Sequence, residues 1–308
     1  MKQVIKIGTR ESQLAVWQAT LVQKLLHKKN VASELIYIKS DGDVDTITPL
    51  YELGVQGIFT KTLDSALLND RIDIAVHSMK DVPTKMAEGI KQAAVLQRAS
   101  FKDILVYKND PLFLEDINGT ATIATSSMRR RAQWLHKYPN HTIENLRGNV
   151  NTRLRKVSEH NWNGAIFAAA GLERIDLRPE ASVDLDWMLP SPAQGAIVIV
   201  CRENDAYSYE ACNTLNDDDT ALCTKIEKDF LRALYGGCST PISGLAEVRA
   251  DKIIFKGNIC SPDGKQVIEI EKESAYKDAG ELGFEAGNEL LQNQQVQEII
   301  DAIRNAKK

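Results

Sequence analysis

Short apolar runs alternate with stretches of helical periodicity over the first two hundred residues, and this alternation restricts the fold more than any other feature. Apolar runs of strand length occur at 4–7, 35–38, 72–76, 104–107, 122–124, 165–168 and 196–201. Between the first runs, apolar residues recur every three or four positions at 14–25 and 59–67, which indicates helices. Such alternation is typical of an α/β fold with parallel layers.

The last third of the chain has a different pattern. The segment between Glu203 and Asp219 is acidic and polar, and a domain boundary is predicted there. Helical spacing resumes at 222–234, three short strand-like runs follow near 244–248, 253–256 and 266–270, and a helical tail begins at about 279. We expect a small α+β domain of roughly 90 residues, which is within the usual range.

Length and charge limit the class of protein. A chain of 308 residues exceeds the size of one hydrophobic core, so two or three domains are expected. Hydrophobic residues make up 43% and charged residues 26%, as in an ordinary globular protein. The net charge of −4 provides no overall basic field, so we expect neither a nucleic-acid partner nor a membrane.

The N-terminal segment and the cysteines predict the compartment. Residues 1–12 lack the apolar core of a signal peptide, and no apolar run is long enough to span a bilayer. The five cysteines form no C-x-x-C pair and have no histidine at ligand spacing, so neither a disulfide framework nor a metal site is predicted. We expect a cytoplasmic protein with free thiols.

A basic stretch follows the predicted strand at 122–124. Residues 128–156 contain eight Lys or Arg and one acid, Glu144, although the whole chain is acidic. Thr125, Ser126 and Ser127 precede Arg129 and Arg130, as expected for a capped helix start. Cations at this end oppose the helix dipole, which indicates a bound anion; the alternative is a solvated basic face.

Further basic residues occupy similar places. Arg147 and Gly148 follow an apolar run, and Arg153 opens the next helical turn. Arg10 and Ser12 repeat the arrangement after the first strand. Because ligands of open α/β sheets bind at the carboxyl ends of the strands, these residues predict a site for carboxylates or phosphates. For Arg10 alone, a solvated arginine in a capping turn is the alternative.

Asp81 is the predicted catalytic residue. The segment His77-Ser78-Met79-Lys80-Asp81 carries a buried strand into a polar turn that Pro83 ends. An acid among many basic groups is expected to be ionised and can stabilise a cation or exchange a proton with a leaving group. The alternative is an Asp that caps the turn. We interpret His77 as a hydrogen-bonded packing residue.

Cys238 lies in a loop of small residues, Gly236-Gly237-Cys238-Ser239-Thr240. An accessible thiol near arginines favours the thiolate and can carry a covalent group. The alternative is an inert free cysteine. The sequence contains no P-loop, G-x-S-x-G or H-E-x-x-H motif, nor a G-x-G-x-x-G after a strand, so nucleotide and metal chemistry are not supported.

With these residues in place, the chain resembles the porphobilinogen deaminase (hydroxymethylbilane synthase) family over nearly its whole length. The resemblance rests on several blocks in one order: 7–15, 73–83, 125–130, 146–153, 170–172, 194–196 and 236–238. It implies two α/β lobes like those of periplasmic binding proteins, joined by two crossing strands, and a small C-terminal α+β domain. The implied domains are 1–97 with 196–216, then 98–195, then 217–308.

The resemblance also implies the chemistry. A dipyrromethane cofactor is joined to Cys238 by a thioether, and four porphobilinogen molecules are added head to tail with loss of ammonia. The product is the linear tetrapyrrole hydroxymethylbilane, and the enzyme is expected to be a monomer.

The site residues are implied position by position. Asp81 contacts the pyrrole nitrogens and stabilises the cationic azafulvene, and Phe59 belongs to a loop over the cleft. Residues implied to hold the cofactor are Ser78, Lys80, Asp81, Thr125, Ser126, Ser127, Arg129, Arg130, Arg147 and Gly148, with Cys238. Residues implied to receive substrate or the growing chain are Arg10, Ser12, Phe59, Arg147, Arg153, Arg174 and Gln194.

Two positions depart from the family pattern. Gln56 stands where the family commonly has Lys, so it can bind a carboxylate without supplying charge. Ala193 stands where Gly usually precedes Gln194, which removes conformational freedom if the position needs a positive φ.

Two other functions are compatible with the same residues. A non-catalytic binding protein for an organic anion would use the strand-end arginines equally well. A nucleic-acid binder using residues 128–156 would have few aromatic residues for stacking beyond Trp134 and Tyr138.

Overall fold

The computed structural model describes residues 4–39, 60–237 and 240–305. The described residues form two compact units. The first lies within Met1–Asp45, Val55–Ala99 and Gly195–Leu222, and the second within Ser100–Gln194 and Cys223–Lys308. The chain therefore leaves the first unit after Ala99 and returns to it at Gly195. The three-domain division expected from the sequence stays a prediction.

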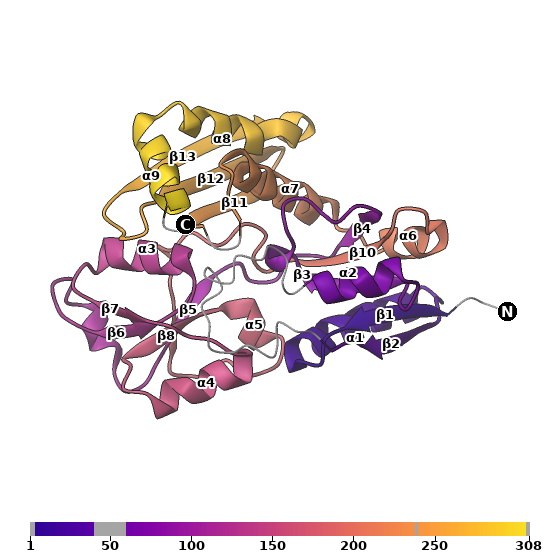
Figure 1. Ribbon diagram of the computed structural model, residues 1–308, viewed down its shortest axis with the longest axis horizontal. Helices are drawn as coiled ribbons and strands as arrows, with labels where there is room; N and C mark the ends of the chain where they lie inside the picture. Colours follow the sequence, from indigo (N-terminus) through magenta and orange to yellow (C-terminus); the bar gives the residue numbers. More distant parts are fainter. Residues whose placement is uncertain (1–3, 40–59, 238–239, 306–308) are drawn as a thin grey trace. The chain divides into compact units, whose positions relative to one another are not determined.

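The first unit contains a mixed five-stranded sheet of order β2-β1-β3-β10-β4 (Figure 1). Its strands are β1 (Ile5–Thr9), β2 (Ser33–Tyr37), β3 (Ile74–Ser78), β4 (Ile90–Val95) and β10 (Ile197–Arg202). Strand β1 is parallel to β2 and β3, as expected, whereas β10 is antiparallel to both β3 and β4. The parallel arrangement expected from the sequence holds for β1, β2 and β3 but not for β10, which enters this sheet when the chain returns from the second unit.

Helices cover both faces of this sheet. Helices α1 (Gln13–Lys28) and α6 (Ala206–Asn213) supply Val22 and Cys212 to the same apolar cluster as Ile5 and Ile7. Helix α2 (Lys61–Leu68) lies on the opposite face. Neighbouring strand residues point to opposite faces, and a Cβ on Gly8 would lie 3.2 Å from Leu63 of α2.

The second unit contains a mixed sheet of order β7-β6-β8-β5-β9. Its strands are β5 (Asp103–Tyr107), β6 (Thr122–Ala124), β7 (Thr142–Glu144), β8 (Gly164–Ala168) and β9 (Ser182–Asp184). Strand β6 is parallel to β7 and β8, and β5 is antiparallel to β8 and β9. Helix α3 (Met128–Lys137) packs on one face through Trp134, and α4 (Val150–Glu159) and α5 (Ala169–Glu173) pack on the other.

The C-terminal part of the second unit is an antiparallel sheet, β11-β12-β13, with helices packed on it (Figure 1). Its elements are α7 (Asp218–Ala233), β11 (Ile242–Arg249), β12 (Lys252–Cys260), β13 (Val267–Ala275), α8 (Leu282–Leu291) and α9 (Gln294–Asn305). Phe230 of α7 packs so closely on β12 that a Cβ on Gly257 would lie 2.6 Å from its ring. The expected α+β arrangement is confirmed.

The turn between β12 and β13 contacts helix α3. Gly264 adopts φ +76°, and its carbonyl oxygen lies 2.9 Å from Nδ1 of His136. A Cβ at this glycine would lie 2.5 Å from the carbonyl oxygen of Ala132. The three-stranded sheet is thus fixed to the helix whose first turn carries Arg129 and Arg130.

All seven strands expected in the first two hundred residues are present, with ends that differ by a few positions. The sequence did not predict β4 or β9, and for β7 it indicated only that a strand ends before Arg147. Among the described helices, none combines the length and apolar character needed to cross a bilayer.

Candidate active site

In the first unit, the strand ends bring five predicted site residues to one sheet edge. Strands β1 and β3 are parallel neighbours, with Ile7 opposite Ile74, so their carboxyl ends meet. The residues at or just after these ends are Arg10, Ser12, Ser78, Lys80 and Asp81. The structure therefore places these five residues at one edge of the sheet, and their role as site residues stays a prediction.

The backbone around Asp81 is held by β3 and β10. Strand β3 continues into a short 3-10 helix, Met79–Asp81, whose first N–H donates to the carbonyl of Ala196 at 3.0 Å. The N–H of Val82 donates back to Met79 at 3.2 Å. Asp81 is half-buried at the end of this turn. Its carboxyl group is therefore carried by a backbone fixed at both sides.

Ser78 is held from the side of helix α1. Its hydroxyl oxygen accepts a hydrogen bond from Nε2 of the buried Gln18 at 2.9 Å. The sequence did not indicate Gln18 as a site residue, although a buried Gln among apolar helix positions is a usable signal.

In the second unit, the loop after β6 contains the predicted hydroxyl groups. Ser127 caps helix α3 and accepts from the N–H of Arg130 at 3.4 Å, as the sequence predicted. The N–H of Thr125 donates to Glu144 of β7 at 2.8 Å. Ser126 Oγ accepts from the N–H of Leu146 at 3.0 Å, so it connects the ends of β6 and β7.

Arg129 and Arg130 are buried against Asp103. Their side chains are only 4% and 7% exposed, and each places a terminal nitrogen 2.7 Å from a carboxylate oxygen of Asp103, which is fully buried. They also donate to the carbonyls of Leu189 and Ile166. The alternative of a solvated basic face was therefore wrong for these two arginines. Part of the negative charge expected at the start of this helix is therefore supplied by the carboxylate of Asp103.

The charge balance of this cluster favours an ionised Asp103. Burial raises its pKa, but the charges of Arg129 and Arg130 and hydrogen bonds from Arg130 and Gln194 outweigh it, so the pKa falls to about 2. Gln194 is buried and donates from Nε2 to Asp103 at 2.9 Å and to the carbonyl of Phe101 at 2.8 Å. The sequence did not indicate Asp103 as a site residue. The usable signal was an acidic residue at the first position of an otherwise apolar strand.

The loop after β7 is built around a glycine. Gly148 has φ +112°, and a Cβ there would lie 2.7 Å from Thr152. Arg153 Nε donates to the Gly148 carbonyl at 2.7 Å, and Lys156 Nζ donates to that of Arg147 at 3.2 Å. The sequence did not single out Lys156 as a support of this loop.

Arg174 is at the end of α5, which follows β8. Burial lowers its pKa to about 10, while Glu173 acts in the opposite direction, so the guanidinium stays positive at neutral pH. Since β6 lies between its parallel neighbours β7 and β8, the loops after all three strands occupy one edge.

Ala193 has the backbone conformation that glycine would adopt most easily. Its φ is +62°, and it is fully buried. Its N–H donates to Oε2 of Glu227 at 2.6 Å, while Oε1 accepts from the N–H of Ala246 at 2.8 Å. The loss of conformational freedom expected where Ala replaces Gly therefore applies to Ala193.

Three predicted positions, Gln56, Phe59 and Cys238, lie outside the described residues. Gly236 and Gly237 before residues 238–239, and Thr240 after them, are described. The N–H of Gly236 donates to Leu231 of α7 at 2.8 Å, and the hydroxyl of Thr240 donates to the carbonyl of Gly237 at 2.6 Å. Both ends of this short segment are therefore fixed by hydrogen bonds.

Together these features define a class of protein, one whose two sheets carry binding groups for an anionic ligand at their edges. Each unit presents hydroxyl and cationic groups at the carboxyl edge of a mixed sheet, and the first adds one carboxylate, Asp81. Such sets suit a ligand with several carboxylates.

Family models and relatives agree on the particular family. "Porphobilinogen deaminase, dipyromethane cofactor binding domain" matches residues 5–210, and "Porphobilinogen deaminase, C-terminal domain" matches residues 221–292. Porphobilinogen deaminase of Acidithiobacillus ferrooxidans is 38% identical over 310 residues, which cover 99% of this chain and 100% of that protein. The chloroplastic enzyme of Pisum sativum is 40% identical, covering 94% and 81%. The chain belongs to the porphobilinogen deaminase family.

Two solved structures resemble this chain at low sequence identity. The methionine binding protein MetQ has a TM-score of 0.43 at 14% identity, with 68% of this chain and 89% of that chain covered. The VFT2 domain of Bordetella pertussis BvgS has a TM-score of 0.42 at 13% identity, covering 71% and 90%.

Proposed function

We propose that Asp81 is the catalytic carboxylate of this chain and that the strand-end arginines bind the carboxylates of its substrate. As a family member, the chain polymerises porphobilinogen to hydroxymethylbilane with release of ammonia. Each addition breaks the C–N bond of an aminomethyl group, forms one C–C bond to a pyrrole carbon, and releases the proton of that carbon together with ammonia as ammonium.

The described residues fit the dipyrromethane cofactor of this family. Such a group supplies the covalent primer on which the tetrapyrrole is built, and Cys238 would hold it. Its carboxylates require cations and hydroxyl groups, and the loops after β6 and β7 bring Thr125, Ser127 and Arg147 to one edge. Arg129 and Arg130 are also proposed to hold it, while part of their donor capacity binds Asp103.

Substrate binding follows the same physical principle. Each pyrrole carries acetate and propionate groups, so a lengthening chain needs several cationic partners. We assign Arg10 and Ser12 of the first unit, and Arg153, Arg174 and Gln194 of the second, to substrate and product chain. For Gln194 this requires its amide to exchange its present partners, Asp103 and Phe101.

Asp81 stabilises the cation that forms when ammonia departs. A carboxylate beside a developing positive charge lowers the barrier most where it is held in position before the reaction. The observation that carries this proposal is the fixed 3-10 turn after β3, with Ser78, Lys80 and Asp81 beside Arg10 at one sheet edge.

The intact mass of the purified protein tests the covalent primer. We expect an excess over the sequence mass equal to two linked pyrrole units, and its loss in Cys238→Ala. A protein that turns over porphobilinogen while keeping its encoded mass would contradict this assignment.

Replacement of Asp81 tests the catalytic role. Asp81→Ala is expected to lower ammonia release by at least about a hundredfold, the scale of one positioned electrostatic group. Its thermal unfolding and its cofactor mass should remain those of the unchanged protein, because Asp81 is only half-buried. Full turnover in this variant would refute the role.

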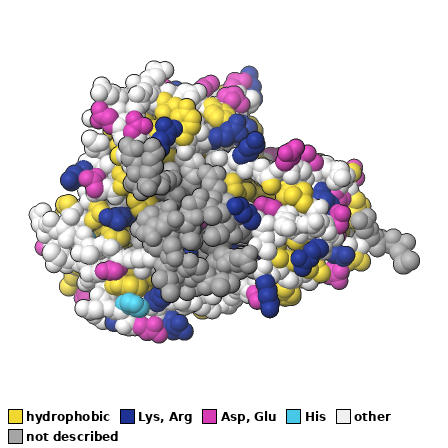
Figure 2. Space-filling model, in the orientation of Figure 1, with side chains coloured by type: hydrophobic (Ala, Val, Ile, Leu, Met, Phe, Trp, Pro, Cys, Tyr) yellow, Lys and Arg dark blue, Asp and Glu magenta, His cyan; other side chains and the backbone are white. Residues whose placement is uncertain are grey.

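We also propose a cytoplasmic monomer that acts without a membrane or nucleic-acid partner. The four described cysteines, Cys201, Cys212, Cys223 and Cys260, are free and buried, which suits a reducing compartment. Figure 2 shows Lys and Arg interspersed with Asp and Glu over the face that it draws, so charge of one sign does not dominate there. Light scattering at several concentrations tests the monomer, and a dimer mass would contradict it.

A further inference from the structure

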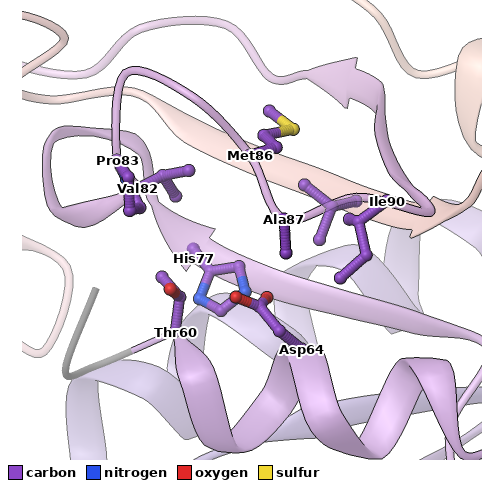
Figure 3. Close-up of a pocket in the computed structure, with 9 residues that line it drawn as sticks. Thr60, Asp64, His77, Val82, Pro83, Met86, Ala87 and Ile90 are labelled. Carbon is purple, nitrogen blue, oxygen red and sulfur yellow. The ribbon is translucent and has the colours of Figure 1, made fainter. Parts of the chain in front are cut away.

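A small pocket lies in the first unit, directly behind the segment that carries Asp81 (Figure 3). Helix α2, strand β3, the segment after Asp81 and strand β10 all contribute to its wall. The lining residues are Thr60, Asp64, His77, Val82, Pro83, Met86, Ala87, Ile90 and Val200. Two of its nine residues, Asp64 and His77, are titratable, and six of the others are apolar.

His77 points to this pocket because of strand alternation. Ile74 and Val76 of β3 face the apolar cluster under α1, so His77 must face the side of α2. Figure 3 shows its ring beneath Ala87, beside the carboxyl group of Asp64. The side chain is 6% exposed, and its Nε2 has no hydrogen-bond partner in the described part of the chain. Only half of the sequence interpretation holds: His77 is buried, but this nitrogen is not hydrogen-bonded.

The imidazole of His77 is neutral at ordinary pH. Burial, assisted by the charge of Arg10, lowers its pKa to about 4. A neutral imidazole has one nitrogen that donates and one that accepts. The pocket therefore contains a buried nitrogen lone pair or a buried N–H that needs a partner, at a cost of roughly 1–3 kcal/mol when it has none.

Asp64 adds negative charge beside it. The side chain is half-buried, and no Lys or Arg of the described segments forms an ion pair with it. Burial raises its pKa, opposed by a hydrogen bond from Thr60. An aspartate stays ionised at neutral pH unless its pKa rises by several units. The polar part of the pocket thus offers a carboxylate, a hydroxyl group and an imidazole to one small guest.

This set suits a compact cation that donates hydrogen bonds. An ammonium ion can donate to the carboxylate, to the hydroxyl oxygen and, when the proton of His77 is on Nδ1, to the lone pair of Nε2. A potassium ion has a similar size but is a hard cation that favours oxygen, so an imidazole nitrogen is a poor ligand for it. A water molecule can bridge such groups but does not balance the carboxylate.

We propose that the pocket formed by Thr60, Asp64 and His77 binds the ammonium ion that the condensation releases. The proposal rests on the family reaction, which produces one ammonium for each C–C bond. Val82 and Pro83 of the wall directly follow Asp81, so the product site adjoins the catalytic turn. The pocket would hold the leaving group apart from the next substrate.

Thermal unfolding of the holoenzyme tests the site without turnover. Titrations with ammonium chloride, potassium chloride and tetramethylammonium chloride, at constant ionic strength, compare size and hydrogen bonding. We expect a saturable rise in the unfolding temperature with ammonium alone, because a ligand that binds only the folded state stabilises it. Equal curves for ammonium and potassium would overturn the proposal and leave water as the guest.

Variants locate the effect. Asp64→Asn is expected to weaken the ammonium effect by about tenfold or more, since it removes the charge and keeps the shape. Glu88→Gln is the matched control, because Glu88 is an exposed acid of the same wall segment that does not line the pocket. An unchanged ammonium curve in Asp64→Asn would also overturn the proposal. If Asp64→Asn does not fold, the three-salt comparison on the unchanged protein decides alone.

Porphobilinogen turnover, measured separately, keeps the two ideas distinct. An enzyme that releases ammonia but shows no ammonium-specific stabilisation would refute the pocket and leave the function in place. Ammonium-specific binding without turnover would refute the proposed function and leave the binding site.

Discussion

Asp103→Asn changes one atom of a fully buried carboxylate that faces two buried arginines. Asp103 lies 2.7 Å from terminal nitrogens of Arg129 and Arg130 and accepts a hydrogen bond from Nε2 of Gln194 at 2.9 Å. A carboxyl whose pKa falls from 3.8 to about 2 on folding stabilises the native state at neutral pH by about 2 kcal/mol. Breaking a buried pair by removing one partner costs about 3–5 kcal/mol.

We therefore expect this variant to lose about 3 kcal/mol of unfolding free energy. For a unit of this size the loss corresponds to a fall of roughly 6–12 °C in its unfolding temperature. Calorimetry and urea unfolding, followed on the transition of the second unit, provide the assay.

Asp184→Asn is the matched control. Asp184 also contacts two cations, Lys102 at 2.8 Å and Arg178 at 2.6 Å, and it belongs to β9, the strand beside β5. Its side chain is 29% exposed and its partners are 33–40% exposed, so solvent screens both ion pairs and their loss should cost much less than the loss of the Asp103 contacts. Equal losses in the two variants would refute the argument that burial decides the cost.

The pH dependence provides a second test of Asp103. Because its pKa is lower in the folded state, its contribution is complete above pH 3.8 and disappears as the pH falls through about 2. The stability difference between the unchanged protein and Asp103→Asn should therefore be constant from pH 5 to 8 and shrink only in strong acid. A difference that shrinks near pH 6 would point to another group.

Two further predictions concern the second unit. Nδ1 of His141 accepts from the indole N–H of Trp134 at 3.1 Å, and burial, opposed by Asp116, lowers the pKa of His141. The stability that this hydrogen bond provides is present above pH 6.5 and is lost as the pH falls through the lowered pKa of His141. The indole N–H resonance of Trp134 should therefore change only below pH 6.5. A titration midpoint above that value would exclude a buried neutral His141 ring. Gly264→Ala should destabilise the second unit by about 2 kcal/mol or more, because Gly264 has φ +76° and contacts α3. Gly280→Ala is the control: a Cβ there would meet no atom within 4 Å, so the stability should change by less than about 1 kcal/mol. Equal effects of the two variants in calorimetry would contradict the packing argument.

The sequence predicted the elements of the fold better than their pairing. Apolar runs and helical spacing located seven strands because a buried strand must be apolar. Direction was not predicted for β10, since an antiparallel strand from a distant segment leaves no periodic signal. The bounds of β7 were not predicted because only Ile143 of its three residues is apolar.

The candidate site was predicted in position but not in detail. Arg10, Ser78 and Asp81 lie at strand ends because such ends collect polar turns in α/β sheets. The partners of Arg129 and Arg130 were not predictable, because Asp103 is 26 positions before Arg129 and only the folded sheet brings them together.

The alternation along β3 has a consequence for how this segment can vary. Ser78 meets Gln18 on one face, while His77 enters the pocket on the other. Substitutions can adjust either face separately. An inserted or deleted codon between Ile74 and Ser78 would exchange the two faces and send the imidazole toward α1. In evolution the length of this strand is therefore more constrained than any single one of its residues, and a gap here in an alignment of working relatives would be unexpected.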